Sequence, residues 1–281
     1  MLLSEASRAF LSQRRIEGYS PYTLKAYDLQ AQLLIRDVGD LELEAVTLQV
    51  LRDHLAKHTH LKPASMGHKV RALRSFFAWL AEEEHLPKNP TLKLKEPKIG
   101  DRVPKALTMD EVESLRDACV GPLEHALVEV FFASGARVGE IHLLNRNAID
   151  FERRAMVVLG KGSKERECYF GSRAAIWLRR YLTARKDTDM ALFVTQRRPI
   201  RRLSIHETQY VFKRVAERCG LRERVSPHVL RHTFATLLLN QDAPITVVQS
   251  LLGHSKPETT MIYARLSGAS RQRMYQRYFV Q

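Results

Sequence analysis

Cysteine is scarce in this sequence, and none of it has the spacing of a metal cluster. Cys119, Cys168 and Cys219 lie far apart, and no C-x-x-C pair occurs. An odd, scattered trio is typical of a reducing cytoplasm and argues against a disulfide framework or a zinc cluster. Acidic clusters with metal-ligand spacing are missing as well. The sequence therefore predicts buried, unpaired thiols and neither a metal nor a cofactor.

Long hydrophobic runs are also missing. No stretch approaches the roughly 18 apolar residues of a membrane span, and the first ten residues lack the layout of a signal peptide. The 281 residues are 44% hydrophobic and 27% charged, which is typical of a globular protein. We therefore expect a cytoplasmic protein, long enough for two domains that each bury a core.

Acidic side chains are the minority charge. Lysine and arginine number 45 against 31 aspartates and glutamates, which gives a formal net charge of +14. Residues 1–100 contribute +3 of this charge and the remainder contributes +11. Such an excess indicates a polyanionic partner held mainly by the second half. A membrane surface would attract the same charge, but no strongly amphipathic basic helix is found. The sequence therefore favours nucleic acid and predicts neither a membrane partner nor a small-molecule substrate.

The first 88 residues have a helical pattern. Ser20 followed by Pro21 resembles a helix cap with proline at the first helical position, and a shorter helix is expected from Thr47. The strongest apolar face runs from Pro63 to Glu84. We therefore predict an all-helical N-terminal domain.

Three cations interleave with that apolar face, namely Lys69, Arg71 and Arg74. They fit a solvated helix face and a set of phosphate contacts about equally well. Phosphate contacts would position a duplex without reading its sequence. Both interpretations stay open from the sequence alone.

Prolines mark the boundary between two domains. Pro87 and Pro90 stop the helix, because proline disfavours helical geometry at the preceding residue. The lysine-rich stretch that follows has little apolar periodicity and is typical of an extended linker. We predict an N-terminal domain over 1–92, a linker over 93–106 and a second domain over 107–281.

The second domain mixes helices with a few strands. Thr108 and Glu111 have the capping-box spacing of a helix start. Strand-like runs at 155–159 and 165–170 flank a glycine-rich turn and predict a hairpin. Further helices are expected at 172–185 and 204–219, with a short strand at 192–194. The fold class predicted is mainly α: an all-helical domain followed by a mixed α+β domain with a small antiparallel sheet.

Six polar side chains of the second domain are weak candidates one by one. His228 and Arg231 share a helix face, and Arg137 lies one turn before Glu140, which alone suggests a surface pair and an ion pair. The other three also have ordinary interpretations as a turn lysine, a helix-end cap and a core tyrosine: Lys161, His254 and Tyr263.

Together these side chains can surround one phosphodiester. Two arginines can clamp the non-bridging oxygens and stabilise the charge that grows on them in the transition state. A tyrosine can form a covalent phosphodiester, although its free pKa of about 10 requires a nearby acceptor and positive charge. A hairpin lysine can protonate the departing sugar oxygen. This chemistry needs no metal.

The arrangement resembles the tyrosine recombinase (phage integrase) family, and most closely its two-domain, Xer-like members. The motifs that carry the resemblance are A-S-G-A-R-V-G-E at 133–140, G-K-G-S-K-E-R at 160–166, H-x-x-R-H at 228–232, L-L-G-H at 251–254, and Tyr263. Residues 71–80 and 88–90 resemble the family's core-binding domain, which is SAM-like. The resemblance covers nearly the whole chain.

The resemblance implies a role for each candidate. Arg137 and Arg231 would grip the scissile phosphate, and Tyr263 would form a 3′-phosphotyrosyl bond. His228 would hydrogen-bond the phosphate and accept the tyrosine proton, and His254 would donate to a non-bridging oxygen.

Three further residues complete the implied site. Lys161 would be the general acid for the 5′-hydroxyl. Lys164 is its rival, disfavoured because it lies beyond the inferred turn, and is otherwise a DNA contact. Glu140 would support Arg137 rather than touch the phosphate.

The resemblance also implies partners: double-stranded DNA with an inverted-repeat site, and a homo-tetramer that exchanges strands through a Holliday junction, with a second recombinase as a possible addition. An apolar stripe at Met274, Tyr278 and Phe279 suggests a tail that docks onto a neighbouring protomer or packs on its own domain. We expect no additional arm-site-binding domain and a nucleoid-associated location. The alternative hypotheses are a type IB-like topoisomerase and a DNA-binding regulator without activity.

Overall fold

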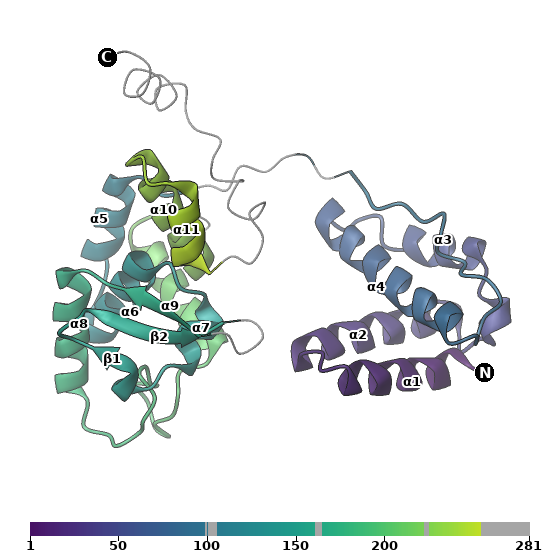
Figure 1. The fold of residues 1–281 in the computed structure, drawn as a ribbon, viewed down its shortest axis with the longest axis horizontal. Helices are drawn as coiled ribbons and strands as arrows, with labels where there is room; N and C mark the ends of the chain where they lie inside the picture. The colour runs from purple at the N-terminus through teal and green to yellow at the C-terminus, as the bar shows by residue number, and fades with distance from the viewer. Residues whose placement is uncertain (99, 101–105, 161–164, 222–224, 254–281) are drawn as a thin grey trace, which may run out of the picture. The chain divides into compact units, whose positions relative to one another are not determined.

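The computed structural model divides into two compact units, Met1–Asp101 and Arg102–Gln281, and each has its own hydrophobic core (Figure 1). The structure describes every residue except 99, 101–105, 161–164, 222–224 and 254–281. Among the described residues, no helix is both long enough and apolar enough to cross a membrane.

The N-terminal unit is helical throughout its regular elements. These are α1 (Leu3–Ile16), α2 (Pro21–Val38), the 3₁₀ turn η1 (Leu43–Ala45), α3 (Leu48–Ala56) and α4 (Pro63–Glu82). The side chain of Ser20 accepts the N–H of Thr23, and Thr47 accepts that of Val50, so both predicted helix starts are confirmed. Helix α4 ends two residues before the predicted limit.

Aromatic rings form the centre of this unit. Phe10 of α1 meets Tyr27 of α2 and Phe76 of α4 edge to face, with ring centroids 5.2 and 5.3 Å apart. Edge-to-face pairs add specific attraction to the burial of the rings. Leu94 is also buried in this core, and Glu96 pairs with Arg71, so the start of the predicted linker packs onto the unit.

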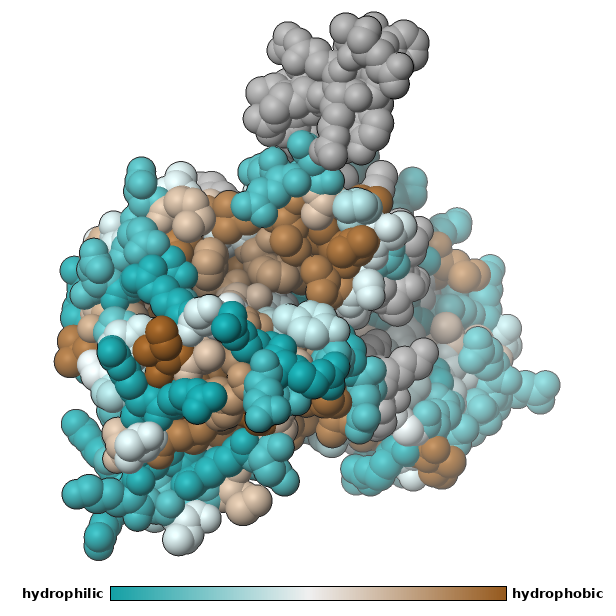
Figure 2. Space-filling view, turned by 60° about the vertical axis from the view of Figure 1, so that its left-hand side comes forward, coloured by the Kyte–Doolittle hydropathy of each residue, from teal (hydrophilic) through white to brown (hydrophobic). Residues whose placement is uncertain are grey.

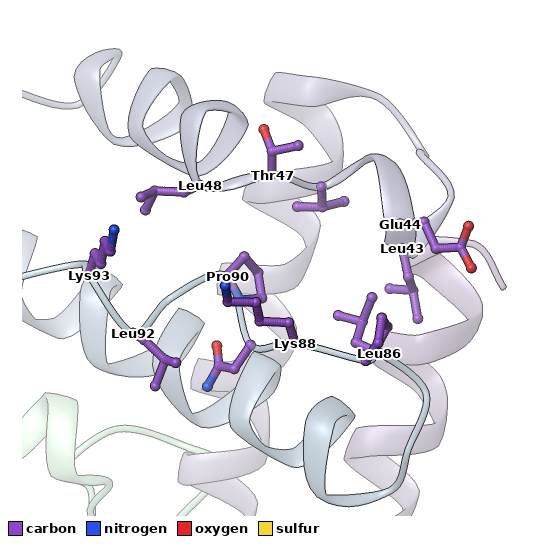
Figure 3. Close-up of a pocket in the computed structure, with 12 residues that line it drawn as sticks. Leu43, Glu44, Thr47, Leu48, Leu86, Lys88, Pro90, Leu92 and Lys93 are labelled. Atoms are coloured by element: carbon purple, nitrogen blue, oxygen red, sulfur yellow. The ribbon is translucent and has the colours of Figure 1, made fainter.

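An open apolar pocket of about 420 Å³ lies between the η1–α3 region and the chain after α4 (Figure 3). Leucines at 43, 48, 86 and 92 line it, together with Lys88 and Lys93. The lining contains none of the residues predicted to perform chemistry. The pocket is therefore not part of the candidate active site.

The second unit is mainly helical with a small sheet (Figure 1). Its helices are α5 (Met109–Asp117), α6 (Gly121–Ser134), α7 (Val138–Leu143), η2 (Arg146–Ala148), α8 (Ser172–Ala184), α9 (Ile205–Arg218), α10 (Pro227–Asn240) and α11 (Ile245–Leu252). Its strands are β1 (Ile149–Asp150), β2 (Ala155–Leu159) and β3 (Glu165–Tyr169). The predicted fold class is confirmed.

Helix α6 is the centre of this unit because it is buried on most sides and packs against α8, α9 and α10. Phe131 of α6 is fully buried and meets Phe212 of α9 edge to face at 5.2 Å. Strands β2 and β3 pair antiparallel with Val157 opposite Glu167, as the predicted hairpin requires. The capping box of Thr108 and Glu111 is also confirmed.

One strand prediction needs correction, and one strand was not predicted. Residues 192–194 are not a strand, because their pairing changes partner within two residues: Leu192 donates to the carbonyl oxygen of Leu144, whereas Phe193 accepts the N–H of Leu203 and Val194 forms an isolated bridge to Arg202. The short strand β1, which pairs with β2, was not predicted. The cysteines are unpaired as expected; Cys119 and Cys168 are buried and Cys219 is half-buried.

We predict that acid destabilises the N-terminal unit through His54. Burial, and then the charge of Lys69, lowers the pKa of His54 to about 4, although Asp37 opposes the shift. The unfolded chain therefore binds the proton more tightly, so stability is complete above about pH 6.5 and falls by on the order of 3 kcal/mol as the pH approaches 4.

Urea unfolding in chelator at several pH values measures this effect. In a Trp177→Phe background, fluorescence of the buried Trp79 reports on the N-terminal unit alone, because the chain has two tryptophans. His54→Gln should flatten the dependence between pH 6.5 and 4, and the control His68→Gln, at an exposed position, should not. Equal slopes in both variants would contradict the assignment.

Candidate active site

The end of α6 sets the position of the first arginine. Gly135 ends the helix with a left-handed φ of 57°. A Cβ at this position would lie 2.5 Å from Cδ1 of Phe234, on α10. Both the backbone conformation and the close approach of α10 therefore require glycine.

Arg137 follows as the cap of α7 and is held by Glu140. The Glu140 carboxylate accepts the backbone N–H of Arg137 at 2.7 Å and its Nη1 at 2.8 Å. Burial would raise the pKa of Glu140, but these hydrogen bonds and the charges of Arg166 and Arg137 lower it overall. Glu140 is therefore ionised and fixes the arginine, which keeps its side chain 36% exposed.

The second arginine comes from α10 and lies close to the first. Arg231 is buried and donates to the carbonyl oxygens of Gly135, at 2.6 Å, and Leu252, at 2.8 Å. Arg137 donates to the next carbonyl along, that of Gly253, at 3.3 Å. The two guanidinium groups thus converge on consecutive peptides at the end of α11.

His228 lies one turn before Arg231 on the same helix. Its ring is exposed, yet neighbouring protein atoms and then the charges of Arg231 and Arg137 lower its pKa. Neutral imidazole is therefore favoured, which is the form that accepts a proton. His232 lies one further turn along, with its ring centroid 6.3 Å from that of His228, and its pKa is lowered by burial and by His228.

Arg166 is a residue that sequence reasoning did not single out. From β3 it donates to Glu140 Oε2 at 2.6 Å, to the carbonyl oxygen of Leu251 at 2.8 Å and to the sulfur of Cys168 at 2.6 Å. Gly253, with φ of 62°, packs against it so closely that a Cβ would lie 2.5 Å from Cδ of Arg166. The signal available in the sequence was the position of Arg166, which lies both inside the 160–166 motif and in a predicted strand.

Four sequence candidates lie outside the described residues: Lys161, Lys164, His254 and Tyr263. Their described neighbours are nevertheless informative. Strands β2 and β3 pair Leu159 with Glu165, which flank the segment that contains both lysines, and α11 ends at Leu252, two residues before His254.

The three cations of α4 differ in their surroundings. Lys69 is buried, and its ammonium group donates to Oε1 of Gln30 at 3.3 Å, inside the N-terminal unit. Arg71 and Arg74 are exposed, and Arg71 pairs with Glu96. The two arginines, rather than Lys69, present their charge at the surface, so the three cations do not share one solvated face of α4.

Hydrophobic side chains gather on the upper part of the second unit (Figure 2), the part where α10 and α11 lie side by side in Figure 1. Val248 and Leu252 of α11 are buried against Ala235 and Leu239 of α10. Val247 is left 47% exposed. Helix α10, which carries Arg231, and helix α11, whose end accepts hydrogen bonds from both arginines, therefore also carry apolar surface.

Known proteins match this fold and these motifs. Residues 105–269 match the phage integrase family. The chain is 35% identical over 277 residues to tyrosine recombinase XerC of Proteus mirabilis, covering 94% of this chain and 90% of that one. It is 35% identical over 240 residues to tyrosine recombinase XerD of Pseudomonas putida, with 80% of each covered.

Among solved structures, XerH recombinase bound to palindromic difH substrate in a post-cleavage complex has a TM-score of 0.72. The match covers 92% of this chain and 80% of that chain at 21% identity, which is a likeness of fold.

The matched residues contain these motifs and form the mainly helical unit with a small antiparallel sheet. Together they define a class of enzymes that cut and rejoin DNA strands. The chain belongs to the phage integrase family, the tyrosine recombinases. The resemblance seen in the sequence is thereby confirmed.

We predict that Arg166→Ala destabilises the second unit by about 3 kcal/mol, because it leaves the buried carboxylate of Glu140 with fewer partners. The matched control is Arg153→Ala, whose 2.8 Å pair with Glu167 is 66% exposed on the arginine side. Exposed pairs contribute less than about 1 kcal/mol. Urea unfolding compares the two variants, and equal losses would contradict the role given to Arg166.

Proposed function

We propose that this chain is a site-specific recombinase that cuts and rejoins double-stranded DNA through a 3′-phosphotyrosyl bond to Tyr263. The observation that carries the proposal is the convergence of Arg137 and Arg231 on the end of α11. Two forked, permanently charged donors at one place suit the non-bridging oxygens of a phosphodiester.

In the cleavage step, the phenol oxygen of Tyr263 attacks the scissile phosphorus and the bond from phosphorus to the 5′-oxygen breaks. His228, whose pKa is lowered, accepts the phenol proton. Lys161 gives a proton to the departing 5′-oxygen. Arg137, Arg231 and His254 hold the negative charge of the pentacoordinate transition state. The step balances without a metal or a cofactor.

Rejoining is the same reaction reversed, with the 5′-hydroxyl of a partner strand as the nucleophile. The covalent bond conserves the energy of the phosphodiester, so religation needs no external energy source. We extend the proposal to a homo-tetramer on an inverted-repeat site, with strand exchange through a Holliday junction, in the cytoplasm. The hydrophobic side chains that gather where α10 and α11 lie (Figure 2) support an assembly of this kind, because contiguous apolar surface marks interaction sites.

The exposed arginines Arg71 and Arg74 would contact the phosphate backbone from the N-terminal unit. Lys164 would add a contact beside the hairpin. These contacts would position the duplex and leave its sequence to be read elsewhere.

We predict that Tyr263→Phe abolishes the covalent protein–DNA adduct, because only the phenol oxygen can form the phosphotyrosyl bond. The substrate is a nicked duplex that carries an inverted repeat obtained by selecting DNA that binds the protein. The covalent adduct is then detected by denaturing electrophoresis. Tyr275→Phe and Tyr278→Phe are the matched controls and should keep the adduct. An adduct that persists in Tyr263→Phe and disappears in either control would move the nucleophile to that tyrosine.

We predict that Lys161→Ala slows cleavage by roughly 10²- to 10⁴-fold, the usual contribution of a general acid. A substrate with sulfur in the bridging 5′ position should restore the rate, since a thiolate leaves without a proton. Lys164→Ala should slow both substrates alike and only slightly. Rescue of Lys164→Ala instead of Lys161→Ala would exchange the two roles.

A further inference from the structure

A compact polar cluster lies inside the N-terminal unit, on residues that take no part in the proposed DNA chemistry. It consists of Asp37 in the last turn of α2, His54 on α3 and His58 just after α3. Their side chains are 8%, 1% and 12% exposed. We call these three residues the Asp37 cluster.

The distances within the Asp37 cluster are short. Oδ2 of Asp37 lies 3.0 Å from Nδ1 of His54 and 2.7 Å from Nε2 of His58. Each of the three residues offers one ligand atom, and all three atoms lie within 4.8 Å of one another. The two histidines are four residues apart, one in the last turn of α3 and one just after it, and both lie against the same carboxylate oxygen.

One atom of the cluster has an unusual environment. Nδ1 of His54 is buried and makes no hydrogen bond of acceptable geometry, although it lies 3.0 Å from the carboxylate oxygen. Buried polar atoms are nearly always satisfied, so an exception asks for an explanation. A cation between the imidazole and the carboxylate would satisfy both atoms at once.

From these contacts we propose that the Asp37 cluster is a binding site for a divalent transition metal of the zinc class. Two imidazole nitrogens and a carboxylate oxygen are a ligand set that suits zinc. Ligands at about 2.0–2.1 Å in a tetrahedron are roughly 3.3 Å from one another. The cluster reaches that geometry by small side-chain rotations, with water as the fourth ligand.

The protonation state of the ligands fits. Burial and the charge of Lys69 lower the pKa of His54 to about 4, so near neutral pH its imidazole has a free electron pair. The pKa of Asp37 is also lowered: burial opposes this, but its hydrogen bonds with His58 and Arg36 and the charges of His54 and Arg36 prevail. Metals bind the neutral imidazole and the ionised carboxylate.

Nearby positive charge acts against a bound dication. Lys69 of α4 influences both His54 and Asp37, Arg36 pairs with Asp37 at 3.1 Å, and Lys57 donates to the backbone oxygen of Asp37. Burial lowers the pKa of Lys69. We therefore expect removal of the Lys69 charge to tighten metal binding, which a purely structural hydrogen-bond junction would not explain.

The consequence for the unit is a clamp between two helices. Bound metal would tie the C-terminal end of α2 to α3 and to the turn after it, in addition to the apolar packing and the hydrogen bonds that already join these segments. Metal bound only by the folded unit raises its thermal stability by mass action. The site therefore predicts a stability that depends on zinc.

The test uses the untagged, full-length chain after treatment with chelator. Zn²⁺ is titrated in competition with a chromophoric chelator, and Co²⁺ is used to record the visible bands of tetrahedral coordination. We expect one equivalent of metal, a rise in the melting temperature of the wild-type chain, and tenfold or greater weakening in Asp37→Asn and His58→Gln. Lys69→Gln should bind at least threefold more tightly.

His85→Gln is the matched control, since His85 is an exposed histidine of the same unit outside the cluster. Far-UV circular dichroism establishes that each variant is folded. The proposal is overturned if the wild-type chain shows no tetrahedral Co²⁺ bands. It is also overturned if His58→Gln and His85→Gln bind zinc equally, because surface histidines would then account for the metal. The wild-type measurements stand even if a cluster variant fails to fold.

Discussion

The buried carboxylate of Glu140 is the interaction on which the second unit's site depends. It accepts hydrogen bonds from the backbone N–H and the guanidinium of Arg137, and from the guanidinium of Arg166 on β3. An ionised carboxylate that is 4% exposed is costly unless such partners surround it. The requirement to satisfy one charge thus joins α7 to the hairpin and, through Arg166, to the end of α11.

Two glycines make this arrangement possible. Gly135 lets α10 approach the end of α6, and Gly253 lets the end of α11 lie against Arg166. Both have left-handed backbone, which other residues rarely adopt. The position of the arginine pair therefore follows from backbone geometry and one buried charge, before any contact with DNA.

Local patterns in the sequence were sufficient for most of the fold. Caps at Ser20, Thr47 and Thr108 marked helix starts, and the glycine-rich turn marked the hairpin, because these signals act over a few residues. The strand β1 is two residues long and depends on its pairing with β2, which no local pattern reveals. The burial of Lys69 could not be predicted locally either, because it results from residues of other helices, such as Gln30 of α2 and His54 of α3.

The sequence revealed only part of the candidate site, because local motifs can be read from it and contacts between distant segments cannot. Motifs identified Arg137, Glu140, His228 and Arg231, and the structure brings these residues together. Arg166 was missed because its partners lie 26 and 85 residues away in the chain. The Asp37 cluster was missed because its carboxylate comes from another helix than its imidazoles, so no spacing in the sequence joins them.

The two arginines of the site are unequal in how firmly they are held. Arg231 is enclosed and makes two short bonds to peptide oxygens, whereas the outer nitrogen of Arg137 reaches Gly253 across 3.3 Å at the surface. A charged oxygen is a stronger acceptor than a peptide carbonyl. An arriving anion can therefore take over the long bond at little cost while the short ones persist. Arg231 is thus the more firmly held of the two guanidinium groups, and Arg137 is the one whose outer nitrogen can be redirected without breaking a short hydrogen bond.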